Sequence, residues 1–164
     1  MYLFSSKNSP LHFQIFLFIV AITCHALDLN VNPDAFRLKA EQGDSVAQYS
    51  YAITFLNLLN GKYDVHSALK WLILSGNKGY IPAQLKIGQM YYSGKEIDRN
   101  YTEAIKWFKK AADKGNAEAL STIGGMYHGG FGVTKDVNIA IKYIKEAAEK
   151  GFAPAQSNLG YMYA

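Results

Sequence analysis

Apolar and small side chains recur along the chain in blocks that follow the periodicity of α-helices. In the segment 81–92 these side chains fall on a single helical face: Ala83, Ile87, Gly88 and Tyr91. A second block, 101–114, also turns one set of side chains inward: Ala104, Trp107, Phe108, Ala111 and Ala112. The pattern predicts a pair of amphipathic helices, which we call helix A and helix B.

This pair recurs with a period of 36 residues. A glycine column follows helix B, and an alanine column lies four residues later: Gly43, Gly79, Gly115 and Gly151, then Ala47, Ala83, Ala119 and Ala155. Aromatic residues keep the same interval in both helices: Phe55, Tyr91, Tyr127 and Tyr163 in helix A, and Trp71, Trp107 and Tyr143 in helix B. Several columns in one register indicate a repeat array.

The expected helix ends carry their own signals. Favourable N-cap residues stand at equivalent places just before helix B: Asp64, Asn100 and Asp136. Asn100 and Glu103 also have the spacing of a capping box. Lys114-Gly115 supplies a cation near the C-terminus of helix B and a glycine that can adopt a left-handed conformation. We therefore expect each helix B to end at this glycine column.

Glycines inside helix A predict close packing of helices. Gly88 and Gly124 lie within the helical pattern, where a glycine costs about 1 kcal/mol relative to alanine. This cost is tolerable if the missing side chain lets another helix approach closely. Because one helical pair cannot enclose a core by itself, neighbouring pairs must stack. The sequence thus predicts an all-α protein, specifically an α/α solenoid.

The repeat resembles the Sel-one-like repeat (SLR), a relative of the tetratricopeptide repeat. The resemblance extends over residues 38–164 and rests on Ala83-Gln84-x-x-Ile87-Gly88-x-x-Tyr91-x-x-Gly94 and Ala104-x-x-Trp107-x-x-x-Ala111-Ala112-x-x-Gly115. It implies a right-handed solenoid of helix-turn-helix units. The first copy departs from this pattern, because Ala52 replaces the helix-A glycine and Ser75-Gly76 replaces the alanine pair; terminal repeats are often atypical.

The period gives an expected domain organisation, in which residues 34–42 form a lone helix B that caps the array. The parts are a signal peptide (1–26), an N-terminal capping helix (27–43), a degenerate repeat 1 (44–79), repeat 2 (80–115), repeat 3 (116–151) and a partial repeat 4 with helix A only (152–164).

Residues 1–26 have the three regions of a signal peptide. Lys7 precedes an apolar run whose strongest part, 16–22, is too short to span a membrane. Cys24 and Ala26 place small residues at the −3 and −1 positions of a cleavage site. We expect a secreted or periplasmic protein. Two alternatives stay open: an uncleaved signal anchor, which would attach the protein to the membrane, and lipid attachment to Cys24.

No residue constellation points to catalysis. Beyond the leader the chain has two histidines, His66 and His128, and no cysteine, and it lacks the common hydrolase and metal-binding motifs. Some SLR proteins are described as penicillin-binding or β-lactamase-like, but they have two cysteines per repeat. We therefore expect no enzyme activity, no cofactor, no metal site and no small-molecule substrate.

The basic residues of helix B do not indicate a nucleic-acid site. Lysines such as Lys106 and Lys142 alternate with acidic residues such as Glu103 and Glu146, and the net charge of the whole chain is only +4. A nucleic-acid footprint would be a stripe of one sign. We interpret this face as a solvated outer surface and expect no nucleic-acid partner.

The resemblance implies a protein-binding adaptor whose concave face is lined by helix A. Positions of helix A that vary between copies are the candidates for contact with a protein or peptide: Ser50, Ile53, Lys86, Gln89, Tyr92, Thr122, His128, Asn158 and Tyr161. The alternative is a structural or self-assembling envelope element that acts through residues 152–164. In that copy no helix B follows. Two explanations stay open: the sequence is a fragment of a longer array, or the apolar residues of this copy meet a second copy or a partner helix.

The leader gives the first testable prediction. The mature N-terminus should be Leu27, because the small residues at positions 24 and 26 fit the cleavage rule. Mass spectrometry of the exported protein measures this directly. Retention of residues 1–26, or a lipid on Cys24, would contradict cleavage and indicate a membrane-attached protein.

Overall fold

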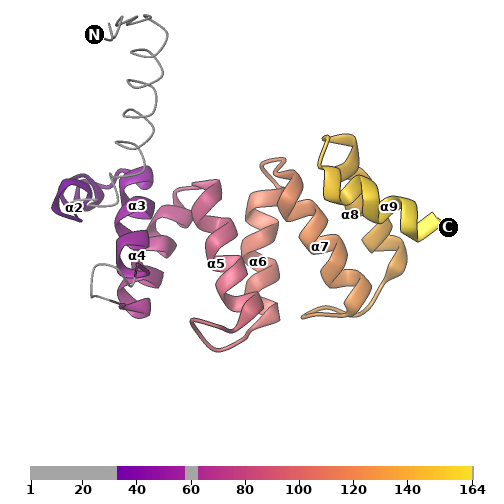
Figure 1. The fold of residues 1–164 in the computed structure, drawn as a ribbon, viewed down its shortest axis with the longest axis horizontal. Coiled ribbons are helices and arrows are strands. Elements are labelled where there is room, and N and C mark those ends of the chain that lie inside the picture. The colour runs from indigo at the N-terminus through magenta and orange to yellow at the C-terminus, as the bar shows by residue number, and fades with distance from the viewer. Residues whose placement is uncertain (1–32, 58–62, 164) are drawn as a thin grey trace, which may run out of the picture. The chain divides into compact units, whose positions relative to one another are not determined.

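The computed structural model describes residues 33–57 and 63–163, and every regular element in these ranges is an α-helix (Figure 1). The leader expected at residues 1–26 lies outside the described part. The helices are α2 (Pro33–Glu41), α3 (Ser45–Phe55), α4 (Val65–Asn77), α5 (Ile81–Ser93), α6 (Tyr101–Ala112), α7 (Ala117–Gly129), α8 (Val137–Glu149) and α9 (Ala153–Tyr163).

These helices alternate between the two predicted types. Helix A corresponds to α3, α5, α7 and α9, and helix B to α2, α4, α6 and α8. Each helix packs against the one before it and the one after it in the chain. The helices expected at 81–92 and 101–114 are Ile81–Ser93 and Tyr101–Ala112, so the all-α prediction is confirmed.

The predicted N-caps of helix B are present. The backbone N–H of Ser67 donates to Asp64 Oδ1 at 3.0 Å, and the same bond recurs at Asn100 and Asp136. The hydrogen bonds from Ser67 lower the pKa of the Asp64 carboxyl. The return bond of the capping box is replaced by an ion pair, since the Glu103 carboxylate lies 2.6 Å from Lys106 Nζ. Two helices A are capped in the same way, by Asp44 and Asn116.

The core consists of two clusters of buried side chains that follow one another along the chain. One cluster lies among α3 to α6 and contains Ala52, Leu72, Ala83, Ile87, Met90 and Trp107. The other lies among α6 to α9 and contains, among others, Phe108, Leu120, Ile123, Met126 and Ile144. The side chains that the pattern turned inward in helix B, from Ala104 to Ala112, are all buried. The repeat periodicity therefore identifies the core correctly.

The two glycines inside helix A lie directly against helix B. A Cβ atom on Gly88 would lie 2.8 Å from the Phe108 ring, and one on Gly124 would lie 2.6 Å from Ile144 Cγ1 and 3.0 Å from the Ala140 carbonyl oxygen. A side chain at Gly88 would displace the Phe108 ring, and one at Gly124 would also meet the backbone of α8. The close approach expected from the sequence is confirmed at both positions.

The end of helix B has the same geometry in each copy. The glycine column adopts positive φ, with values of 93°, 86°, 78° and 83° at Gly43, Gly79, Gly115 and Gly151. At Gly115 its N–H donates to the Ala112 carbonyl, and the next N–H, of Asn116, donates to the Ala111 carbonyl. These bonds satisfy carbonyl groups that the helix end would otherwise leave unpaired, and they turn the chain into the next helix A.

Lysine and glutamine side chains connect neighbouring helices at the junctions that follow α2 and α4. Lys114 Nζ donates to the Gly79 carbonyl at 2.7 Å, and Lys78 Nζ donates to the Gly43 carbonyl, so each lysine reaches the end of the preceding helix B. A glutamine of helix A donates to the preceding helix B through Nε2: Gln48 to the Ala40 carbonyl, Gln84 to the Gly76 carbonyl and Gln156 to the Ala148 carbonyl. Leu120 takes this place in α7. The lysine bond therefore joins successive repeats rather than capping its own helix.

Replacement of the buried glycines tests this packing. Gly88→Leu and Gly124→Leu should each lower the free energy of unfolding by at least about 1–3 kcal/mol, because the new side chain collides with α6 or α8. Thermal or denaturant unfolding measures the loss.

Gly125→Leu is the matched control, since nothing lies within 4 Å of a Cβ atom at this helical position. It should keep or raise stability, because leucine has a higher helix propensity than glycine by about 1 kcal/mol. Equal unfolding midpoints for all three variants would contradict the packing.

Candidate functional site

The surface predicted to bind a partner consists of positions on the helices A, and we call it the helix-A face. Gln89, His128 and Asn158 are exposed, on α5, α7 and α9. Other members are half-buried: Ser50 and Ile53 on α3, Lys86 and Tyr92 on α5, and Thr122 on α7. The side chain of Tyr161 lies outside the described part. The structure thus distributes the predicted residues over four successive helices A.

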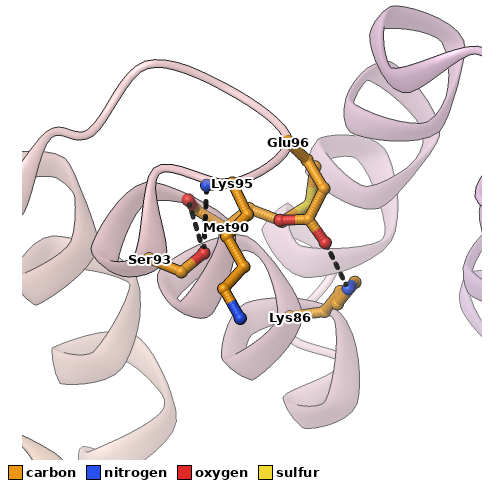
Figure 2. Close-up of polar contacts among 5 residues, drawn as sticks. All are labelled: Lys86, Met90, Ser93, Lys95 and Glu96. Carbon is orange, nitrogen blue, oxygen red and sulfur yellow. Dashed lines mark hydrogen bonds and ion pairs between the residues drawn. The ribbon is translucent and has the colours of Figure 1, made fainter.

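Lys86 is already engaged in an ion pair within its own repeat. Its Nζ lies 3.3 Å from Glu96 Oε1, and the two side chains are only 29% and 23% exposed (Figure 2). In the same turn, the N–H of Lys95 donates to Ser93 Oγ, which donates to the Met90 carbonyl. The pair ties the turn after α5 back to that helix, and it neutralises the positive charge of Lys86.

Tyr92 belongs to an aromatic cluster that joins two repeats. Its ring centroid lies 5.3 Å from that of Tyr101 and 6.2 Å from that of Phe131, and the latter two are 5.1 Å apart. Arg99 lies over the Tyr101 ring at 5.7 Å. Tyr92 therefore packs the turn that follows α7 against the preceding repeat, whereas Phe131 keeps 38% of its surface exposed.

Tyr49 of α3 packs edge to face against Tyr80, the N-cap residue of α5. The rings of Tyr49 and Tyr80 lie 5.4 Å apart. Burial, together with the neighbouring Tyr80 hydroxyl, raises the pKa of Tyr49. A tyrosine hydroxyl is neutral at physiological pH, and the raised pKa keeps that of Tyr49 neutral over a wider pH range.

A recess lies between α6 and α8, the helices B of repeats 2 and 3, and is lined in part by α7. It has a volume of about 620 Å³, and we call it the helix-B groove. Its main lining side chains are Lys109 and Asp113 from the α6 side, Leu120 and Tyr127 from α7, and Lys142, Tyr143 and Glu146 from α8. Sequence reasoning treated these helix-B residues as a solvated face and missed the recess.

Aromatic rings form one wall of the helix-B groove. The rings of Tyr127 and Tyr143 are stacked, with centroids 5.8 Å apart and an interplanar angle of 10°. The ammonium group of Lys109 lies 5.9 Å from the Tyr127 centroid. A sequence signal for this site existed, because Leu120 interrupts the glutamine column and Glu146 stands where repeat 2 has Lys110.

Side chains suited to metal chemistry are dispersed in the described ranges. No group of three or more histidine, cysteine, aspartate or glutamate residues there could hold a metal ion. His66 lies in α4 and His128 in α7. Within the same ranges, every helix is too short or too polar to cross a membrane.

Known structures resemble this arrangement. A protective antigen of uropathogenic Escherichia coli strains that displays an SLR fold has a TM-score of 0.75 and 32% identity; the match covers 80% of this chain and 28% of that protein. A Sel1 repeat protein from Oxalobacter formigenes has a TM-score of 0.70 and 28% identity, with 77% and 95% covered. The chain thus spans less than a third of the Escherichia coli protein.

A more distant structure shares the fold alone. Helicobacter pylori cysteine rich protein B has a TM-score of 0.63 and 15% identity, and the match covers 80% of this chain and 97% of that protein. Among curated proteins, none matches the chain.

The family comparison agrees with the repeat seen in sequence and structure. The Sel1 repeat model matches four consecutive segments, 45–80, 81–116, 117–152 and 153–164. These segments begin with α3, α5, α7 and α9. The glycine column, the glycines inside helix A and the structural neighbours agree with this match. The chain belongs to the Sel1 repeat family.

Proposed function

We propose that this protein is an exported, non-enzymatic adaptor that binds a segment of another protein through the helix-A face. Sel1 repeat proteins generally act as protein-interaction scaffolds, which supports the class of function. The leader expected at residues 1–26 supports export to the periplasm or the cell exterior.

The observation that carries the proposal is the register of exposed and buried positions on successive helices A. Gln89 and Gly125 are exposed, whereas the residues that follow them, Met90 and Met126, are fully buried. The buried core holds this register in α5 and α7, the helices A of repeats 2 and 3. An extended segment would therefore meet one fixed set of side chains per repeat.

The chemistry of the face favours a polar, largely uncharged contact. Gln89 and Asn158 carry amides, and the Thr122 hydroxyl donates to the Glu118 carbonyl at 2.9 Å. The positive charge of Lys86 is paired with Glu96. Exposed amides both donate and accept hydrogen bonds, so they suit the backbone of an extended peptide segment.

Site-specific photo-crosslinking in cells of the protein's own source tests the proposal. A benzophenone side chain at Gln89 and, in a second variant, at Asn158 should capture the same distinct protein. The matched control is the same side chain at Lys70, which is exposed on α4, a helix B that does not line the recess between α6 and α8. Equal capture from Lys70, or no capture from the helix-A positions, would contradict binding through this face.

The same experiment addresses the alternative function. If the captured protein is a second copy of this chain, the result favours self-association, and the site on the captured copy should then lie within residues 152–164. Light scattering of the purified protein over a range of concentrations would show the corresponding increase in mass. A single mass at all concentrations would contradict self-association.

A further inference from the structure

The helix-B groove has a counterpart one repeat earlier, and the counterpart is filled by the chain itself. Between α4 and α6, the ammonium group of Lys110 lies 3.7 Å from the centroid of the Trp107 ring and donates to Asn77 Oδ1 at 3.1 Å. Trp107 in turn packs on Gly76, where a Cβ atom would lie 2.9 Å from the ring. At this position a cation is held between an aromatic face and an oxygen acceptor.

At the equivalent positions thirty-six residues later, between α6 and α8, no lysine stands in the place of Lys110, and the side chains there are more acidic. Glu146 stands in the place of Lys110, Asp113 in the place of Asn77, and Tyr143 in the place of Trp107. Within the described ranges, neither Asp113 nor Glu146 takes part in an ion pair. The groove thus presents two carboxylates and a ring where the previous repeat holds an ammonium group.

In the described part of the chain, the neighbouring lysines make no ion pair with the two carboxylates, Asp113 and Glu146, at this end of the groove. Lys109 and Lys142 line the groove one helical turn before the two acidic residues, and Lys109 lies over Tyr127. Lys150 Nζ lies near Gly115, at 3.4 Å from the position of a Cβ atom there. Among the ion pairs of the described residues, none joins Lys150 to Asp113 or to Glu146.

The helix ends add to the negative potential. Asp113 is the C-cap of α6, and Glu146 lies in the last turn of α8. The C-terminal end of a helix carries about half a negative charge, so a carboxylate there is unfavourable and a cation is favourable. Two acidic residues at two such ends form a place that attracts a positive group.

The rest of the groove suits the aliphatic part of a basic side chain. Leu120 replaces the glutamine that elsewhere crosses to the preceding helix, and the Tyr127 and Tyr143 rings form a wall. The volume of about 620 Å³ is in the range of pockets that enclose small ligands. It therefore accommodates a long side chain together with its neighbouring residues.

We propose that the helix-B groove binds an arginine or lysine side chain of a partner protein segment. The basic group lies against Tyr143 between Asp113 and Glu146, as the ammonium of Lys110 lies against Trp107 one repeat earlier. Because Lys109 and Lys142 line the other end, a single basic residue fits better than a run of them. The helix-B groove is separate from the helix-A face. The proposal for one can therefore fail its test while the proposal for the other holds.

Titration of the purified full chain with short blocked peptides tests this inference by nuclear magnetic resonance. The probe is acetyl-Gly-Gly-Arg-Gly-Gly-amide, and the reference peptides carry citrulline or glutamate in place of arginine. The arginine peptide should shift the signals of Asp113, Tyr143 and Glu146 and bind at least about tenfold more tightly than the citrulline peptide, because charge-assisted hydrogen bonds are lost with the charge.

Two variants and a control sharpen the result. Glu146→Gln with Asp113→Asn should weaken binding of the arginine peptide at least about tenfold, whereas Glu118→Gln, an exposed carboxylate elsewhere on α7, should leave it unchanged. Glu146→Lys with Asp113→Asn recreates the Lys110–Asn77 pair and should abolish binding while the unfolding midpoint stays equal or rises.

Several results would overturn the inference. These are equal binding of the arginine and citrulline peptides, stronger binding of the glutamate peptide, signal changes confined to other helices, and unchanged binding by the Glu146 and Asp113 variants. Absence of any signal change at millimolar peptide would also overturn it. The unfolding midpoint of each variant shows that a loss of binding does not come from a loss of fold.

Discussion

The turn that follows each helix B is the constraint on which the rest of the structure depends. Its glycine must adopt a positive φ, which an L-residue with a side chain reaches only at a cost of about 1–2 kcal/mol. This conformation directs two N–H groups to the last carbonyls of the helix. At Gly43 and Gly79 the glycine carbonyl also accepts a hydrogen bond from the lysine of the next repeat. One residue therefore ends a helix and begins the next, and at these two positions it also connects two repeats.

Between these turns, the packing of helix A against helix B determines the two candidate surfaces. Gly88 and Gly124 allow helix B to approach until Phe108 and Ile144 touch the helix-A backbone, and this contact fixes which helix-A residues point outward. The proposed helix-A face is a consequence of that register. The helix-B groove arises from the opposite situation, because at one position the side chains do not fill the space between two helices B.

The sequence predicts the repeated parts of this structure well, because they depend on local rules. The period of 36, the N-caps Asp64, Asn100 and Asp136, and the left-handed glycines all follow from helix periodicity and backbone chemistry. The candidate sites depend instead on contacts between side chains of different segments. The pairing of Lys86 with Glu96 and the packing of Tyr92 on Phe131 require knowing how a turn folds back. Predicting the groove requires knowing that Tyr143 and Glu146 leave open a space. One repeat earlier, Trp107 and Lys110 fill the equivalent space.

The central claim is that the backbone conformation of the junction glycine, rather than its small size, holds the repeats together. Replacement of Gly115 by L-alanine and, through chemical ligation, by D-alanine separates backbone conformation from size. The Cβ atom of L-alanine would meet only Lys150 Nζ, at an ordinary distance of 3.4 Å, so the added methyl group has room. Equilibrium unfolding should show a loss of about 1–2 kcal/mol for L-alanine and no loss for D-alanine, which adopts positive φ readily. An equal loss in both variants, or no loss in either, would contradict this account.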